Sequence, residues 1–95
     1  MLKITFQSGS LPEPAVLTLE GRIAGRWVDE LRRVYDEHHG VAHALTIDLR
    51  EVTFIDQAGV GFFEDVYGQV TLVNCSLFAA EQLKPVLERH DAVRR

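Results

Sequence analysis

Short segments with the period of a β-strand alternate with segments that have the period of an α-helix along this chain. Apolar and polar residues alternate, or β-branched residues dominate, in four segments that we expect to be strands: 2–6, 15–20, 44–49 and 70–75. Apolar residues recur at helical spacing in three further segments, which we expect to be helices: 25–39, 57–67 and 77–90. The order β-β-α-β-α-β-α predicts an α/β fold in which helices cover one side of a small mixed β-sheet.

Glycine, proline and capping residues set the expected ends of these elements. The spacing of the first two strands fits a hairpin, with Gly21 ending the second strand. Gly40 is expected to end the first helix. Ser76 is a suitable N-cap for the last helix, which Pro85 must kink or split.

An alternative assignment extends the second helix through 70–74 and makes 76–80 the last strand. The high β propensity of 70–73 disfavours this alternative. We expect the core to contain apolar residues from both strands and helices: Leu31, Val34, Leu45, Ile47, Leu49, Val73 and Leu87.

The composition fits one small domain spanning 1–95. Ten Lys and Arg against fourteen Asp and Glu give a net charge of −4, which offers no basic surface to a nucleic acid. The N-terminal residues do not form a signal peptide, and no apolar run approaches the roughly 20 residues of a membrane span. We expect a cytoplasmic protein that binds neither nucleic acid nor membrane, and the sequence leaves a homo-oligomer open.

Side chains that could carry chemistry are few and scattered. Four histidines are expected to be solvated rather than to bind a metal: His38, His39, His43 and His90. Cys75, at the end of a predicted strand, is expected to be a small core residue. We find no catalytic constellation, and therefore expect neither an enzyme nor a cofactor.

The segment Asp56-Gln57-Ala58-Gly59-Val60-Gly61 lies between an extended segment and a helix start. Asp56 is a suitable N-cap, because its carboxylate can accept the N–H of Ala58 or Gly59. Gly59 allows another backbone to approach closely, and the N–H groups of the first turn could hold an anion. The glycine spacing completes neither a dinucleotide fingerprint nor a Walker A loop, so a cap and a tight turn are the simpler interpretation.

The two adjacent phenylalanines of the second helix cannot both lie on one helical stripe. We expect Phe62 near the surface, where it would form an apolar patch with Val60 beside Gly59. In the alternative, a thin domain buries both Phe62 and Phe63, each against a different neighbour. The sequence leaves these two arrangements open.

Three motifs carry a family resemblance. Residues 45–61 combine a hydrophobic strand, a V-x-F-I-D segment and a glycine-containing helix start, in the sequence LTIDLREVTFIDQAGVG. Upstream, 17–23 reads LTLEGRI, and downstream, 70–74 reads VTLVN. In order and over most of the chain, these motifs resemble those of STAS domains (sulphate transporter and anti-sigma factor antagonist). The resemblance implies the family's mixed sheet with helices on one side.

For a stand-alone bacterial protein, the resemblance implies partner switching in transcription regulation. Such a domain binds an anti-sigma factor, a serine kinase with a histidine-kinase-like ATPase fold, and so releases the sigma factor. Phosphorylation of the second serine of the family's D-S-S-G motif blocks that binding, because it places charge in the interface. Here Gln57 and Ala58 occupy the two serine positions, so the phosphoryl acceptor is absent. Thr53 and Ser76 lie near in sequence but outside the motif position.

The resemblance therefore implies a non-catalytic regulatory module that binds an anti-sigma-type protein without the serine phospho-switch. The residues expected to bind the partner belong to the turn and the helix after it: Asp56, Gln57, Ala58, Gly59, Val60 and Phe62. The alternative is a STAS-like domain that binds a small ligand or nucleotide, with 56–61 as its anion site. An uncharacterised enzyme or enzyme subunit is the third hypothesis.

Overall fold

The computed structural model describes residues 1–9, 14–39 and 45–88, excluding the side chain of His39. The predictions for Gly40, His43 and His90 lie outside the described residues. The elements follow the predicted order, with one short 3₁₀ helix added: β1 Leu2–Gln7, β2 Ala15–Ile23, α1 Arg26–His39, β3 Leu45–Ile55, α2 Gln57–Val66, η1 Tyr67–Gln69, β4 Thr71–Val73 and α3 Leu77–Gln82.

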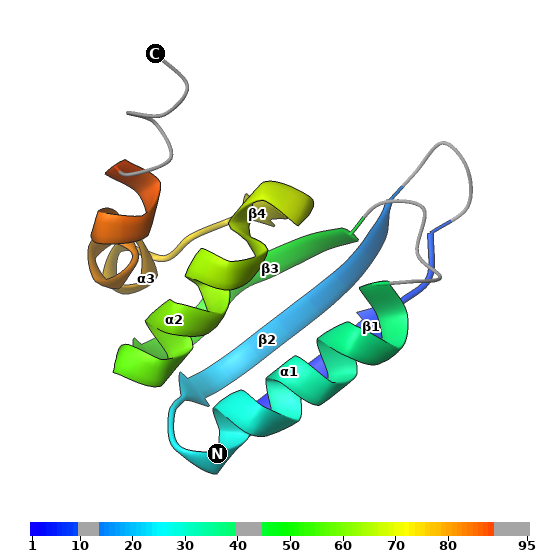
Figure 1. The fold of residues 1–95 in the computed structure, drawn as a ribbon, viewed down its shortest axis with the longest axis horizontal. Coiled ribbons are helices and arrows are strands. Elements are labelled where there is room, and N and C mark those ends of the chain that lie inside the picture. The colour runs from blue at the N-terminus through cyan, green and yellow to red at the C-terminus, as the bar shows by residue number, and fades with distance from the viewer. Residues whose placement is uncertain (10–13, 40–44, 89–95) are drawn as a thin grey trace.

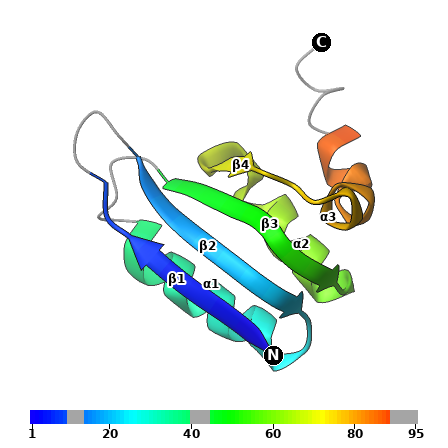
Figure 2. The same ribbon diagram turned by 180° about the vertical axis from the view of Figure 1, so that it is seen from behind.

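The four strands form one mixed sheet in the order β1-β2-β3-β4. β1 pairs with β2 in antiparallel fashion, as the hairpin prediction required, whereas β2–β3 and β3–β4 are parallel pairs. Helices α1 and α2 lie across one face of the sheet (Figure 1). Figure 2 shows the opposite face, where the strands β1 and β2 are not covered by any described helix. The predicted α/β fold with a mixed sheet is confirmed.

β1 ends one residue later than predicted, and β2 and β3 run several residues further. β2 continues through Gly21, because this glycine does not end the strand but accommodates the start of the chain. Its φ is 107°, and a Cβ atom there would lie 2.5 Å from the carbonyl oxygen of Met1. That same carbonyl accepts the backbone N–H of Arg22 at 3.1 Å. Gly21 is therefore a point of close backbone approach within the strand.

β3 continues to Ile55 because two irregularities absorb the break in its alternation. Its pairing with β2 shifts between Thr18 and Glu20, and again between Gly21 and Arg22. At each shift β3 contains one more residue than β2, as in a β-bulge. The charged residues of 50–51 fall at the first shift, which is why the alternation of apolar and polar residues stops before them.

The core lies between the sheet and the helices. The prediction is confirmed for four residues that are buried: Leu31, Leu45, Ile47 and Leu49. Val34 and Leu87 are only partly buried against that core. Val73 was wrongly assigned to it, since the parallel pairing places Val73 opposite Asp48 and therefore on the open face of the sheet.

The last part of the chain follows the favoured assignment, with Thr71–Val73 as a strand and Leu77–Gln82 as a helix. The strand is shorter than predicted, because Asn74 adopts a positive φ of 55° and turns the chain. Helix α3 ends before Leu83, and residues 84–88 are helical again. This break agrees with the effect expected of Pro85, which cannot donate a backbone hydrogen bond. α3 lies beside the carboxyl-terminal half of β3 (Figures 1 and 2).

Candidate functional site

Asp56 joins three segments at the start of α2. Its backbone N–H donates to the carbonyl of Ile23 at the end of β2, at 3.0 Å. One carboxylate oxygen, Oδ1, accepts the N–H of Gly59 at 2.8 Å, which is the predicted N-cap. The other, Oδ2, accepts the N–H of Gly25 at 2.9 Å, in the turn between β2 and α1. One side chain therefore holds the β2–α1 turn and the start of α2 together.

These hydrogen bonds favour the charged form of the carboxylate. The N–H groups of Gly25 and then of Gly59 are the largest causes that lower the pKa of Asp56 below its ordinary value. The negative charge also lies at the positive end of the α2 dipole, where it is favourable. Asp56 is thus a fixed anion at neutral pH.

Gly59 is buried where α2 meets the ends of two strands. A Cβ atom at this position would lie 2.8 Å from Cγ2 of Ile55 and 3.0 Å from the carbonyl oxygen of Ile23. Real Cβ contacts are not this short, so only glycine lets the helix start approach the sheet so closely. The close backbone approach predicted for this glycine is confirmed.

The residues after the cap divide between surface and core. Gln57 and Ala58 are exposed, and Val60 is partly buried. Phe62 and Phe63 are both 0% exposed, so the predicted surface position of Phe62 is wrong and the alternative, in which the domain buries both, is confirmed. Helix α2 packs against both the sheet and α1, so more than one of its sides is buried and the side chain of Phe62 cannot reach a partner.

Aromatic contacts keep Phe62 inside. Its ring makes edge-to-face contacts with Tyr35, at 5.7 Å between centroids, and with Phe63, at 5.2 Å. The guanidinium of Arg32 lies 5.3 Å from its centroid. The surface offered by the predicted partner-binding set therefore reduces to Asp56, Gln57, Ala58 and Val60, with Gly59 setting its shape.

The anion-site hypothesis loses support from the same geometry. A phosphate would need free N–H groups at the start of α2, but the carboxylate of Asp56 already accepts the N–H of Gly59. An incoming anion would also meet the negative charge of that carboxylate. The arrangement is that of a capped, close-packed turn.

The remaining sequence candidates lie apart from this turn. Among the described residues there is no group of three or more metal-ligating side chains. His38 is not solvated as expected, but partly buried, and its ring stacks on that of Phe6 with centroids 3.7 Å apart. Cys75 is a partly buried residue beyond the end of β4, packed against the core.

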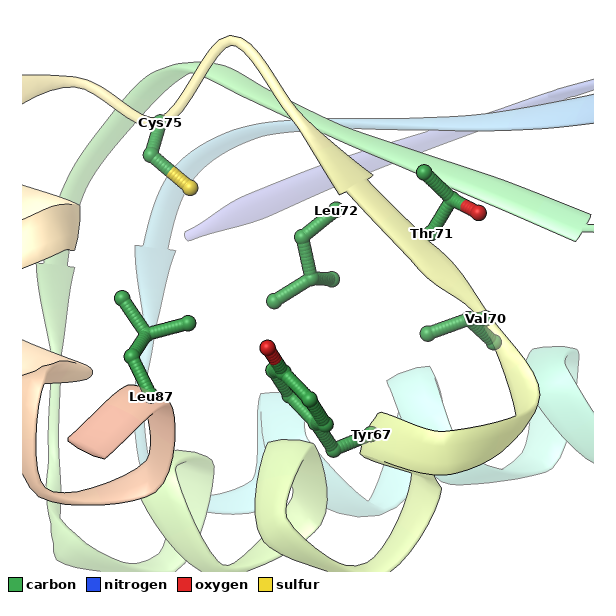
Figure 3. A pocket seen from close by; sticks show the side chains of 6 residues that line it. All are labelled: Tyr67, Val70, Thr71, Leu72, Cys75 and Leu87. Atoms are coloured by element: carbon green, nitrogen blue, oxygen red, sulfur yellow. The ribbon is translucent and has the colours of Figure 1, made fainter. Parts of the chain in front are cut away.

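Cys75 also lines a pocket of about 270 Å³ near the C-terminal end of α2 (Figure 3). Mostly apolar side chains line it together with Tyr67 and Thr71, and the Tyr67 hydroxyl points towards its middle. Burial raises the pKa of the Cys75 thiol, which makes it a poor nucleophile at neutral pH.

Comparison with protein families identifies the class. The chain matches the family model of the STAS domain over residues 7–91, nearly its whole length, and it belongs to this family. A search of curated proteins found no match. STAS domains are generally non-catalytic, and the family suggests a regulatory module like the anti-sigma factor antagonists. No helix in the described part of the chain is long and apolar enough to cross a membrane.

Sequence reasoning missed the hydrogen bond from Gly25 to Asp56. Nothing in a local motif links residues that lie 31 positions apart. The signal that could have found it is the β-β-α-β-α order itself, because parallel β2 and β3 bring the two following turns to the same end of the sheet.

Proposed function

We propose that this chain is a bacterial, cytoplasmic anti-sigma factor antagonist that acts by binding a protein partner at the start of α2. The partner is an anti-sigma factor of the serine-kinase type, with a histidine-kinase-like ATPase fold. Family membership supports this class of function. The single observation that carries the site is the rigid turn at 56–59, whose backbone is fixed by Asp56 and whose next two side chains face solvent.

A preorganised surface of this kind is well suited to a protein interface. Because the turn is already ordered, little conformational entropy is lost when a partner binds. Ala58 is small and exposed, so a partner can approach the backbone of the first helical turn. The only charge contributed by this set is that of Asp56, which is already engaged by two N–H groups.

The serine phospho-switch of the family is absent from this proposal, because Gln57 and Ala58 carry no hydroxyl group. Of the two nearby hydroxyl residues, Ser76 is partly buried, and its Oγ bonds both the carbonyl of Val52 and the N–H of Ala79. Thr53 is exposed. If regulation by phosphate has moved within this region, Thr53 is the more accessible acceptor.

Affinity capture from a native lysate, followed by identification of the bound protein by mass, tests the partner class. We expect an ATPase with a histidine-kinase-like fold to be captured without added ligand. The captured kinase is then incubated with this chain and ATP, and the intact mass is measured. An unchanged mass is the expected result. Stoichiometric phosphate on Thr53 would show a relocated switch, and capture of unrelated proteins alone would contradict the proposal.

A further inference from the structure

A second exposed surface lies at the same end of the sheet as the start of α2. We call it the aromatic–arginine patch, and it consists of Arg22, Phe54, Leu77 and Phe78. The guanidinium of Arg22 lies 4.4 Å from the ring centroid of Phe54. The rings of Phe54 and Phe78 have centroids 6.2 Å apart. Leu77 is 94% exposed and Phe78 is 41% exposed, so two adjacent large apolar side chains lie at the surface beside Phe54.

The sheet register brings the members of this patch together. Arg22 pairs with Phe54 across β2 and β3, and both side chains lie opposite the core face. Helix α3 starts beside this part of β3, where the Ser76 hydroxyl donates to the carbonyl of Val52 at 3.2 Å. The first two residues of α3, Leu77 and Phe78, therefore extend the surface begun by Phe54.

Arg22 has no carboxylate partner within the described ranges. The ion pairs found there involve other cations, namely Lys3, Arg32 and Arg33. The guanidinium of Arg22 instead lies over the ring of Phe54. A cation that rests on an aromatic surface, beside exposed apolar groups, is the composition enriched at the centres of protein interfaces.

We propose that the aromatic–arginine patch binds an apolar segment of the protein partner that carries a carboxylate beside its apolar side chain. The carboxylate would pair with Arg22, and the apolar group would cover Leu77 and Phe78. This inference rests on the proposed function, because the partner is the one that docks at the start of α2. The two surfaces are close in the fold: Phe54 precedes Asp56 by two residues, and Ile23, next to Arg22, accepts the Asp56 N–H.

Charge favours a carboxylate-bearing protein segment over a second copy of this chain and over a membrane surface as the occupant of the patch. In a two-fold contact with a second copy, the patch would meet itself and bring two Arg22 cations together without an added carboxylate. An anionic membrane surface is recognised by clusters of several Lys and Arg. The patch has one arginine, in a chain whose net charge is −4. A protein segment with a carboxylate beside an apolar side chain supplies the missing counter-charge and needs no cluster of basic residues.

Selection from a displayed library of random peptides, with acidic and basic residues equally represented, tests the inference without the natural partner. We expect the enriched peptides to carry Asp or Glu beside Leu, Phe or Trp. Their affinity should fall at least tenfold for Leu77→Ser and for Arg22→Glu. The matched control is Arg26→Glu, since Arg26 is also exposed and lies over an aromatic ring, Trp27, at 5.4 Å.

Leu77→Ser changes a side chain that is almost fully exposed, so the fold should persist, and circular dichroism verifies it. The proposal is overturned if no peptide is enriched, if basic peptides are enriched, or if binding is insensitive to both variants. Binding to phosphatidylglycerol vesicles without peptide enrichment would overturn it in favour of a lipid surface. Because the selection uses an intact α2 start and no natural partner, its failure leaves the proposed function standing.

Discussion

The starts of helices α2 and α3 use the same capping device but present opposite kinds of surface. In both, the cap side chain accepts the N–H three residues further on, from Gly59 to Asp56 at 2.8 Å and from Ala79 to Ser76 at 3.0 Å. At α2 the next residues are polar or small, Gln57 and Ala58, whereas at α3 they are large and apolar. Capping thus fixes where a helix begins, while the two residues after the cap decide what kind of partner it can meet.

The caps also differ in the rest of their bonding. The second carboxylate oxygen of Asp56 accepts the N–H of Gly25 in the β2–α1 turn. Because the carboxylate is charged, both of its hydrogen bonds are charge-assisted. Ser76 is neutral and donates its hydroxyl to the edge of β3. The start of α2 is therefore the more strongly constrained of the two, and this difference can be measured.

The largest expected effect on stability is that of Gly59→Ala, which should destabilise the protein by about 1–3 kcal/mol through overpacking against Ile55 and Ile23. The matched control is Gly61→Ala in the same helix, where a Cβ atom meets nothing within 4 Å. That control should stabilise the protein by about 0.5–1 kcal/mol. Denaturant unfolding measures both, and equal effects would contradict the close packing of the α2 start.

Removal of the two caps should have unequal effects. Asp56→Ala breaks charge-assisted bonds to Gly25 and Gly59, and should cost about 2 kcal/mol. Ser76→Ala breaks neutral bonds and should cost about 1 kcal/mol. The comparison uses the free energies of unfolding of both variants at neutral pH. A larger loss of unfolding free energy for Ser76→Ala would contradict our inference that the start of α2 is the more strongly constrained.

The smallest predicted effect is a dependence on pH. Because the pKa of Asp56 is lowered in the folded state, its ionisation stabilises the fold above its ordinary pKa of about 3.9. This contribution should fade as the pH falls below that value and vanish below the folded-state pKa. The stability advantage of the wild type over Asp56→Asn should shrink over the same range. A difference independent of pH would show that the charge of Asp56 does not contribute.

The sequence alone predicted those structural features that depend on residues close together in the chain. The order of elements, the Asp56 and Ser76 caps and the break near Pro85 each follow from side chains that act on their own backbone. The wrong predictions concern residues whose burial depends on a segment far away in the sequence. Phe62 is buried because α2 is covered on two sides, and Val73 faces outwards because of its register with β3.

The aromatic–arginine patch belongs to the second kind of feature. Its members come from β2, β3 and α3, and only the shifted register of the sheet brings Arg22 beside Phe54. In contrast, the surface at the α2 start is one continuous run of sequence, which a motif can reveal. Of its predicted members, Phe62 and Gly59 are buried, and Asp56, Gln57, Ala58 and Val60 remain at least partly exposed.

The most direct test of the docking surface is calorimetric titration of the captured partner with the wild type and with Ala58→Glu. Glutamate in the first helical turn is favourable to the helix by about 0.3–1 kcal/mol, so the variant should remain folded, as circular dichroism can verify. In the complex its charge would be buried without a counter-charge, at a cost of several kcal/mol.

Gln7→Glu is the matched control, because it adds the same charge at an exposed position at the other end of the sheet. We predict that Ala58→Glu loses at least tenfold in affinity while Gln7→Glu binds as the wild type does. Equal binding by a folded Ala58→Glu would place the interface elsewhere and contradict the account.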